Sequence, residues 1–278
     1  MIRQACVSGM FYEKNPQYLK EDIRNLFGKV EEDDNIHGNI VAGIAPHAGY
    51  IYSGKTASYT FNKISKEELP DTFIILGPNH TGRGTMIDVC DYSKWETPLG
   101  LVDVDNEFIQ ELLNVDADVY IDNNAHSREH SIEVELPFLQ YICEGHEFRI
   151  VPIVISQQIP QLCESLAESL VKVTKKLNRK CIVIASTDLT HYEDAETAKF
   201  LDSKVIKSVE DMNMKQLVKD IIDYDITMCG YGPVITAVNY CKLLNANSSS
   251  VLNYTNSGET SGDYDSVVGY MSAVITKN

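Results

Sequence analysis

Short apolar segments alternate with amphipathic ones along most of the chain. The apolar segments are rich in β-branched residues and predict strands at Asn39–Ala45, Thr72–Leu76, Phe148–Ile155, Cys181–Ala185, Val251–Tyr254 and Val267–Ile275. Segments with apolar residues at helical spacing predict helices at Pro16–Phe27, Ser131–Cys143, Gln161–Leu177, Phe200–Glu210 and Pro233–Leu244. The polar segment Glu31–Gly38, with its acidic run Glu31–Asp34, is interpreted as a loop before the first of these strands.

This order of elements predicts an α/β fold. Nearly continuous apolar strands are typical of a sheet that helices cover on both faces. The sequence contains no repeat and no low-complexity linker, so we expect residues 1–278 to form a single three-layer αβα domain with a mixed, mainly parallel central sheet. The last two strands are expected to be antiparallel and joined by the glycine-containing loop Ser257–Tyr264. Sheets of this class bind ligands beyond the carboxyl ends of their strands.

Three predicted strands lead directly into motifs that contain a histidine. His47 follows the first strand, His80 the second and His191 the fourth. A single histidine in a loop is most often a surface or hydrogen-bonded group. Three histidines at equivalent strand ends indicate that the rings converge at one edge of the sheet, with glycines beside them where the backbone turns tightly. Imidazoles together with a carboxylate or a thiolate suit iron, copper or zinc.

Asp188 and Cys229 are candidates for the additional metal ligand. Cys229 lies just before a predicted helix, where the helix dipole lowers a thiol pKa and favours the thiolate. A buried structural cysteine is an equally good interpretation of this residue. His130 lies directly before another predicted helix, and it either faces the same crevice or makes a local cap. Glu133 lies in the first turn of that helix. A favourable interaction with the helix dipole explains a carboxylate there as well as a role in a ligand pocket does.

Composition narrows the function further. The chain has 278 residues and a formal net charge of −16, with a sequence pI near 4.8, which disfavours nucleic acid and anionic membranes as partners. Seven cysteines without a C-x-x-C pair argue against a disulfide framework or a structural zinc site. The sequence shows no membrane-spanning apolar segment and no secretory signal, so we expect a cytoplasmic protein. Phosphate-loop, Rossmann and serine-hydrolase motifs are missing from the sequence.

The motifs taken together resemble those of the MEMO family, in the family's order and over essentially the whole chain. The matching pieces are Val7–Tyr12, Pro46–Tyr50, Leu76–His80, Trp95–Gly100, His130–Glu133, Asp188–His191, Cys229–Pro233, Ser261–Asp263 and Val268–Tyr270. Several motifs in one order are far more specific than any of them alone. The resemblance implies a MEMO-like domain whose fold is distantly similar to that of class III extradiol dioxygenases.

The resemblance also implies a metal site and a set of pocket residues. Class III extradiol dioxygenases hold iron(II) with two histidines and a glutamate, and a cysteine replaces the glutamate in the MEMO family. The ligands implied for this chain are His47, His80 and Cys229, with Fe(II) or copper as the metal. Asp188 and His191 are the additional pocket residues, and His130 is a further histidine close to them. Because a thiolate is softer than a carboxylate, it shifts the preference toward copper(I) and is itself oxidisable.

Two functions of different class follow from this resemblance. The first is a non-haem iron or copper redox enzyme that acts on a small molecule, with His191, oriented by Asp188, as acid and base. The second is a non-catalytic module that binds a peptide or handles a metal and works with a radical-SAM partner protein, as prokaryotic relatives do. A third and weaker hypothesis is a cysteine-nucleophile hydrolase that uses Cys229 and His191.

Overall fold

A central mixed sheet of 12 strands organises the part of the chain that the computed structural model describes, which is residues 1–31 and 38–277. Along the main path the strand order is β1-β5-β6-β8-β3-β9-β2-β12-β10, with β11 paired to β12, and β4 paired to β8 and β7. Strands β6, β8, β3, β9 and β2 run parallel, while β12 is antiparallel to β2 and β11 is antiparallel to β12. The strands are β1 (Ile2–Arg3), β2 (Asn39–Ala45), β3 (Thr72–Pro78), β4 (Ile87–Val89), β5 (Lys94–Thr97), β6 (Gly100–Val104), β7 (Val119–Ile121), β8 (Arg149–Ile155), β9 (Cys181–Ser186), β10 (His191–Glu193), β11 (Ser248–Asn256) and β12 (Val267–Lys277).

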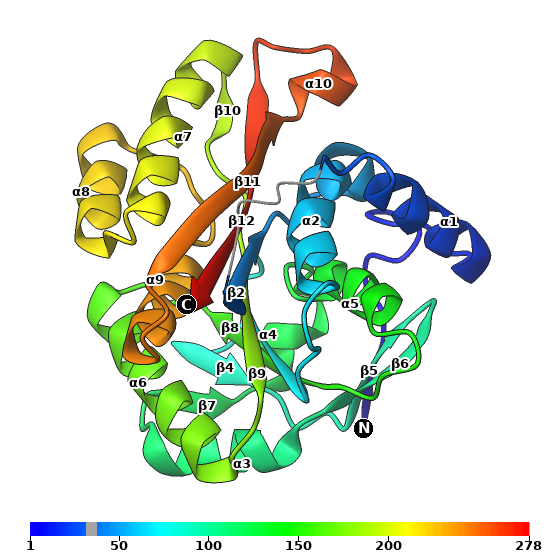
Figure 1. The fold of residues 1–278 in the computed structure, drawn as a ribbon, viewed down its shortest axis with the longest axis vertical. Helices are drawn as coiled ribbons and strands as arrows, with labels where there is room; N and C mark the ends of the chain where they lie inside the picture. The colour runs from blue at the N-terminus through cyan, green and yellow to red at the C-terminus, as the bar shows by residue number, and fades with distance from the viewer. Residues whose placement is uncertain (32–37, 278) are drawn as a thin grey trace.

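Helices cover both faces of this sheet (Figure 1). One face carries α1, α2 and α5, and the other carries α6, α7, α8 and α9. The helices are α1 (Pro16–Phe27), α2 (Tyr50–Ile64), α3 (Asn106–Val115), α4 (Asn123–Ser127), the 3-10 helix η1 (Glu133–Glu135), α5 (Leu136–Ile142), α6 (Pro160–Leu177), α7 (Ala195–Glu210), α8 (Met214–Tyr224), α9 (Tyr231–Leu243) and α10 (Gly258–Ser261). The predicted three-layer α/β fold is therefore confirmed.

The predicted elements agree with the structure in type, and most differences lie at their ends. Each predicted strand is present, and β11 and β12 are antiparallel as expected. The predicted helix Ser131–Cys143 is instead a 3-10 turn followed by the short helix α5, and Pro137 at the start of α5 fits this late beginning. Helix α2 was not predicted, because its many small and hydroxyl residues hide the helical period. The polar run at 31–34 falls largely outside the described residues.

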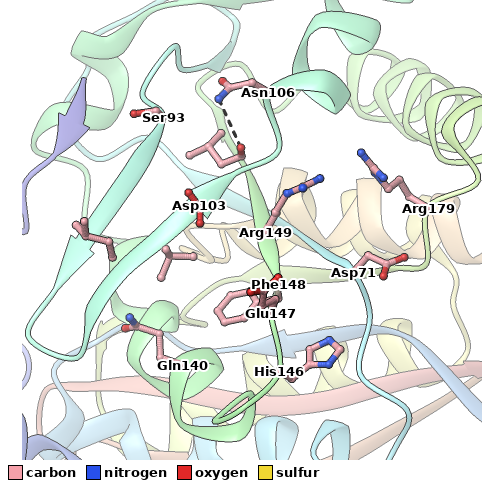
Figure 2. A pocket seen from close by; sticks show the side chains of 13 residues that line it. Asp71, Ser93, Asp103, Asn106, Gln140, His146, Glu147, Phe148, Arg149 and Arg179 are labelled. Atoms are coloured by element: carbon pink, nitrogen blue, oxygen red, sulfur yellow. Dashed lines mark hydrogen bonds between the residues drawn. The ribbon is translucent and has the colours of Figure 1, made fainter.

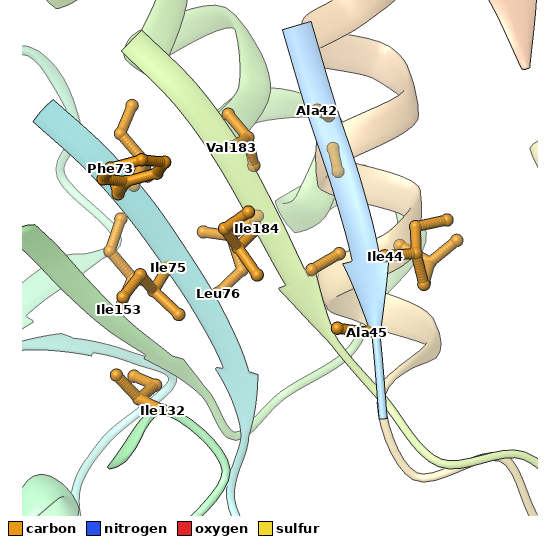
Figure 3. Packing of buried hydrophobic residues seen from close by; sticks show 14 of the residues in the cluster. Ala42, Ile44, Ala45, Phe73, Ile75, Leu76, Ile132, Ile153, Val183 and Ile184 are labelled. Carbon is orange, nitrogen blue, oxygen red and sulfur yellow. The ribbon is translucent and has the colours of Figure 1, made fainter. Parts of the chain in front are cut away.

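The core lies between the central parallel strands and the helices on either face. Ile44, Ile75 and Ile184 come from three neighbouring strands and are fully buried (Figure 3). Helix α2 approaches β2 closely, because a Cβ on Gly43 would lie only 2.6 Å from the Thr60 side chain. β2 ends at Ala45, and α2 begins at Tyr50 directly after the short loop that carries His47.

The strand order brings three motifs together. β9 lies between β3 and β2 in the sheet, although it follows both in the sequence. Ala45 of β2 is in register with Ser186 of β9, and Leu76 of β3 is in register with Ala185. The carboxyl ends of the three strands are therefore adjacent and level, which is where this class of sheet places its ligand sites.

Candidate metal centre

Three histidines and one cysteine meet at the carboxyl ends of these strands. Ring nitrogens of His47, His80 and His130 lie within 4.8 Å of one another. The Sγ atom of Cys229 lies 3.3 Å from Nε2 of His47. We call His47, His80, His130 and Cys229 the histidine–cysteine cluster. The three histidines form the compact group, and Cys229 adjoins it through His47 and is not among the ligand atoms that lie within 4.8 Å of one another. His130 thus lies beside His47 and His80 instead of forming only a local cap.

His47 is buried and held from two sides. Its backbone N–H donates to Oδ1 of Asp188 at 2.8 Å, and its ring Nδ1 lies 2.8 Å from Oγ of Ser186. Nε2 is therefore the ring nitrogen that points toward Cys229. Burial, followed by the neighbouring His80 and His130 rings, keeps the pKa of His47 well below its ordinary value of 6.5. A buried neutral imidazole is the form that binds metals.

Glu129 organises the His80 and His130 side of the cluster. Its carboxylate accepts from the His80 backbone N–H at 2.6 Å and lies 2.9 Å from His80 Nδ1, and it also accepts from the backbone N–H of His130 and of Ser131. Burial alone would raise the pKa of Glu129, but these hydrogen bonds outweigh burial and lower it to about 2. An ionised carboxylate can only accept, so His80 donates from Nδ1 and keeps Nε2 free for a ligand.

The two partly exposed histidines differ in charge preference. Burial disfavours the charged form of His80, but the hydrogen bond and the charge of Glu129 raise the pKa of His80 above 6.5. Burial is the largest effect on His130 and lowers its pKa to about 4. The His130 ring also packs against Phe11, with 4.7 Å between ring centroids. His80 is thus the first of the three cluster imidazoles to take a proton as the pH falls.

Cys229 lies in the tight turn before α9, one residue from the N-cap Gly230. A Cβ on Gly230 would lie 2.5 Å from the carbonyl oxygen of Ser186, so only glycine allows this close approach. The backbone N–H of Asp188 donates to Cys229 Sγ at 3.2 Å. The expected lowering of the Cys229 pKa is wrong for the thiol without a bound cation, because burial and then the Asp188 charge raise it. Metal binding at this thiol would have to displace a proton.

Asp188 and His191 are close to the cluster but are not hydrogen-bonded to each other. The Asp188 carboxylate accepts from the His47 backbone, and burial raises the pKa of Asp188 to about 6. The His191 ring donates from Nδ1 to the carbonyl of Thr227 at 2.9 Å. The Thr227 carbonyl therefore orients His191, in contrast to the expectation that Asp188 does so. Cys229 contacts His47 and is not hydrogen-bonded to His191, so the Cys229–His191 pair of the hydrolase hypothesis is not formed.

A buried ion pair anchors the N-terminus beneath the segment that carries Glu129 and His130. Arg3 pairs with Glu133, and both side chains are almost fully buried. Arg3 also donates to the Glu129 carbonyl at 2.7 Å, which ties the N-terminal strand to the cluster. Glu133 further accepts from Tyr12 Oη at 2.7 Å. Glu133 is therefore a structural anchor and not a helix-dipole residue or a direct part of the cluster.

A cleft lies at the opposite end of the sheet from the cluster. It has a volume of about 840 Å³ and is lined by residues at the amino ends of strands, among them Asp71, Arg149 and Arg179 (Figure 2). Asp103 in its wall pairs with Lys94, and Arg179 pairs with Asp105. None of the cluster residues lines this cleft, so it is separate from the candidate metal centre.

Sequence reasoning missed the groups that orient the cluster. Glu129, Ser186 and Glu135 lie behind the histidines and are fully buried. A signal for Glu135 was available, since it is a carboxylate within the apolar segment Ile132–Leu139. Glu129 adjoins His130 in the sequence, but its contact with His80 bridges 49 positions and follows only from the fold.

The fold and the cluster define an α/β protein with a group of three histidines and an adjoining thiol at the carboxyl edge of its sheet. The chain belongs to the Memo-like protein family, whose model matches residues 3–274. It is 42% identical to a MEMO1 family protein of Methanocaldococcus jannaschii and 41% identical to one of Methanobrevibacter smithii, each over 99% of both chains. A solved structure of an uncharacterised protein from Escherichia coli is similar in fold, with a TM-score of 0.57 and 11% identity over 86% of this chain and 100% of that chain.

Proposed function

We propose that this protein holds one iron(II) or copper ion between His47, His80 and Cys229 and acts as a redox enzyme on a small molecule in the cytoplasm. The observation that carries the proposal is the 3.3 Å between His47 Nε2 and Cys229 Sγ. Two ligands of one tetrahedral ion with bonds of about 2.1 and 2.3 Å lie roughly 3.6 Å apart. The two atoms are therefore already near the spacing that a shared ion needs.

The donor set fits a late transition metal. Two imidazoles and a thiolate suit copper, iron and zinc, whereas magnesium and calcium prefer oxygen ligands. His130 offers a further imidazole, and its ligand atom lies within 4.8 Å of those of His47 and His80. A bound iron or copper ion would supply one-electron chemistry there. Glu129 and Ser186 would keep the ligand rings in fixed orientations.

His191, Asp188 and His130 are the residues that we assign to substrate. The Thr227 carbonyl holds the His191 ring by Nδ1, so its Nε2 is available to exchange a proton with a ligand. Asp188 lies between the His47 backbone and Cys229 and adds negative charge to the pocket floor. His130 offers a neutral ring for a hydrogen bond. Apart from Asp188, these residues are partly open to solvent, as substrate contact requires.

A second function, a peptide-binding or metal-handling module that works with a radical-SAM partner protein, is favoured by apolar side chains on the rim. Met10, Ile51 and Tyr192 are exposed. Ile51 and Tyr192 lie close in sequence to His47 and His191, and Met10 precedes Phe11, whose ring packs against His130. Exposed apolar residues around a pocket are typical of a surface that another molecule covers. Both functions include a bound metal ion, but only the enzyme converts a substrate.

Metal analysis and oxygen uptake separate these functions. We expect one equivalent of iron or copper in protein purified without chelators, and oxygen consumption when small reducing substrates are added. Metal without oxygen uptake would favour the metal-handling module. If neither metal binds to the wild-type protein at neutral pH, the proposal of a metal centre is wrong.

Metal binding is expected to weaken as the pH falls through the pKa of His80, which lies above the ordinary 6.5, because protonation of His80 competes with the metal. Glu129 raises the pKa of His80, so Glu129→Gln should move this loss to lower pH. The same variant should also bind metal about 10-fold more weakly at high pH, because the acceptor of the ligand ring loses its negative charge. Titrations of iron(II) at several pH values measure both effects, with Glu144→Gln on the surface as the matched control. An unchanged pH profile in Glu129→Gln would contradict His80 ligation.

A further inference from the structure

The hydroxyl of Ser186 lies at the centre of a buried hydrogen-bond group behind His47. Its Oγ atom is 2.7 Å from the Ser131 carbonyl oxygen, 2.8 Å from Oε1 of Glu135 and 2.8 Å from Nδ1 of His47. All four residues are at most 1% exposed, so their hydrogens must be shared among themselves. A serine hydroxyl donates one hydrogen and accepts two. The three contacts therefore permit few distributions of hydrogens.

Only one distribution gives each contact a hydrogen. A backbone carbonyl can only accept, so Ser186 must donate its single hydrogen to Ser131. The other two partners must then donate to Ser186 Oγ. Glu135 consequently carries a proton on Oε1, and His47 carries its hydrogen on Nδ1. If Ser186 donated to Glu135 instead, two oxygens 2.7 Å apart would face each other without a hydrogen between them.

The surroundings of Glu135 independently disfavour a charge. Its second oxygen, Oε2, is buried and has no hydrogen-bond partner among the described residues. Burial, and to a lesser degree the negative charge of Asp188, raise the pKa of Glu135 well above its ordinary value. An ionised carboxylate in such a place would lose its hydration without gaining enough donors. The contrast with Glu129 is clear, because that carboxylate accepts four hydrogen bonds.

We propose that a protonated Glu135 and Ser186 form a neutral hydrogen-bonded chain that holds His47 in its Nδ1–H tautomer, with Ser186 as the positioning residue. The Nε2 lone pair of His47 is then directed at Cys229 Sγ, where the proposed metal centre would place the ion. The use of this tautomer rests on that proposed function, but the hydrogen distribution does not. Glu129 is thus ionised and Glu135 is neutral, although both lie behind the histidines of the same cluster.

Nuclear magnetic resonance of ¹⁵N-histidine-labelled protein without added metal tests the tautomer. The wild type should show His47 as the Nδ1–H form, and Ser186→Ala should lose this preference because its acceptor is gone. Infrared spectra at about pH 8 should show a protonated carboxyl band that Glu135→Gln removes. His47 in the Nε2–H form in the wild type, or no such band, would overturn the proposal.

Metal titration compares the same substitution at two buried glutamates. Ser186→Ala should weaken iron(II) binding by about 10–100-fold, whereas Glu135→Gln, which keeps a neutral donor to Ser186, should weaken it much less than Glu129→Gln does. Glu129→Gln is the matched variant and should weaken binding, because there a charge is removed. Equal losses in both glutamine variants would show that Glu135 is ionised. If wild-type protein binds no iron, the proposed function fails while the tautomer and infrared results still decide this proposal.

Discussion

Cys229→Ser is expected to abolish most of the metal affinity while the fold remains intact. The substitution changes the side-chain volume little, but it replaces a thiolate with a neutral hydroxyl, which is a poor ligand for iron or copper. Substitution of a group that only orients a metal ligand lowers metal affinity by about 10–100-fold. The loss of affinity in Cys229→Ser should be larger than this. Competition titration with iron(II) or copper(I) measures it, and circular dichroism checks the fold.

The matched control is Cys163→Ser, since Cys163 is also a free thiol but is buried in α6, away from the cluster. That variant should lose stability and keep its metal, and Cys143 and Cys181 should behave likewise. Alkylation gives a second measurement, because a bound metal should slow labelling of Cys229 and chelation should restore it. A metal content that is equal in the wild type and in Cys229→Ser would remove Cys229 from the ligand set.

Breaking the Arg3–Glu133 pair is expected to produce the largest loss of stability. Removal of one partner from a buried ion pair leaves an uncompensated charge and costs about 3–5 kcal/mol of the free energy of unfolding. Arg3→Met leaves the Glu133 carboxylate with its neutral donors only, at Cys6, Val7 and Tyr12. Urea unfolding of the metal-free protein measures the effect without interference from ligand binding.

The double variant Arg3→Met with Glu133→Leu should recover part of this loss, because neither charge then remains buried. The pH dependence has a definite sign. Burial alone would raise the pKa of Glu133, but Arg3 outweighs burial and lowers it below 4.5. The stabilisation is therefore present above the unfolded-state pKa near 4.3 and is lost as the pH falls through the lower folded-state value. A loss under about 1 kcal/mol in Arg3→Met, a value typical of exposed pairs, would contradict this account.

The sequence by itself determined the class of the fold, its main buried strands, several of its helices and the family. Apolar strands such as Thr72–Leu76 and the helical period of Gln161–Leu177 reflect burial on both faces of a sheet, which is a local property of the pattern. The sequence could also place His47 and His80 just beyond strand ends, because the end of an apolar run is visible in the residues. It could not show helix α2, whose buried serines and threonines are satisfied by tertiary contacts.

Only the tertiary structure decided which groups meet. The insertion of β9 between β3 and β2 brings Asp188 beside His47 across 141 positions and Cys229 beside His47 across 182. The protonation states depend on the same packing: Glu129 is ionised because backbone N–H groups converge on it, and Glu135 is neutral because they do not. Sequence motifs can identify the residues of a site. The charge of each residue is set by its hydrogen bonds and burial, and these depend on neighbours that are distant in the chain.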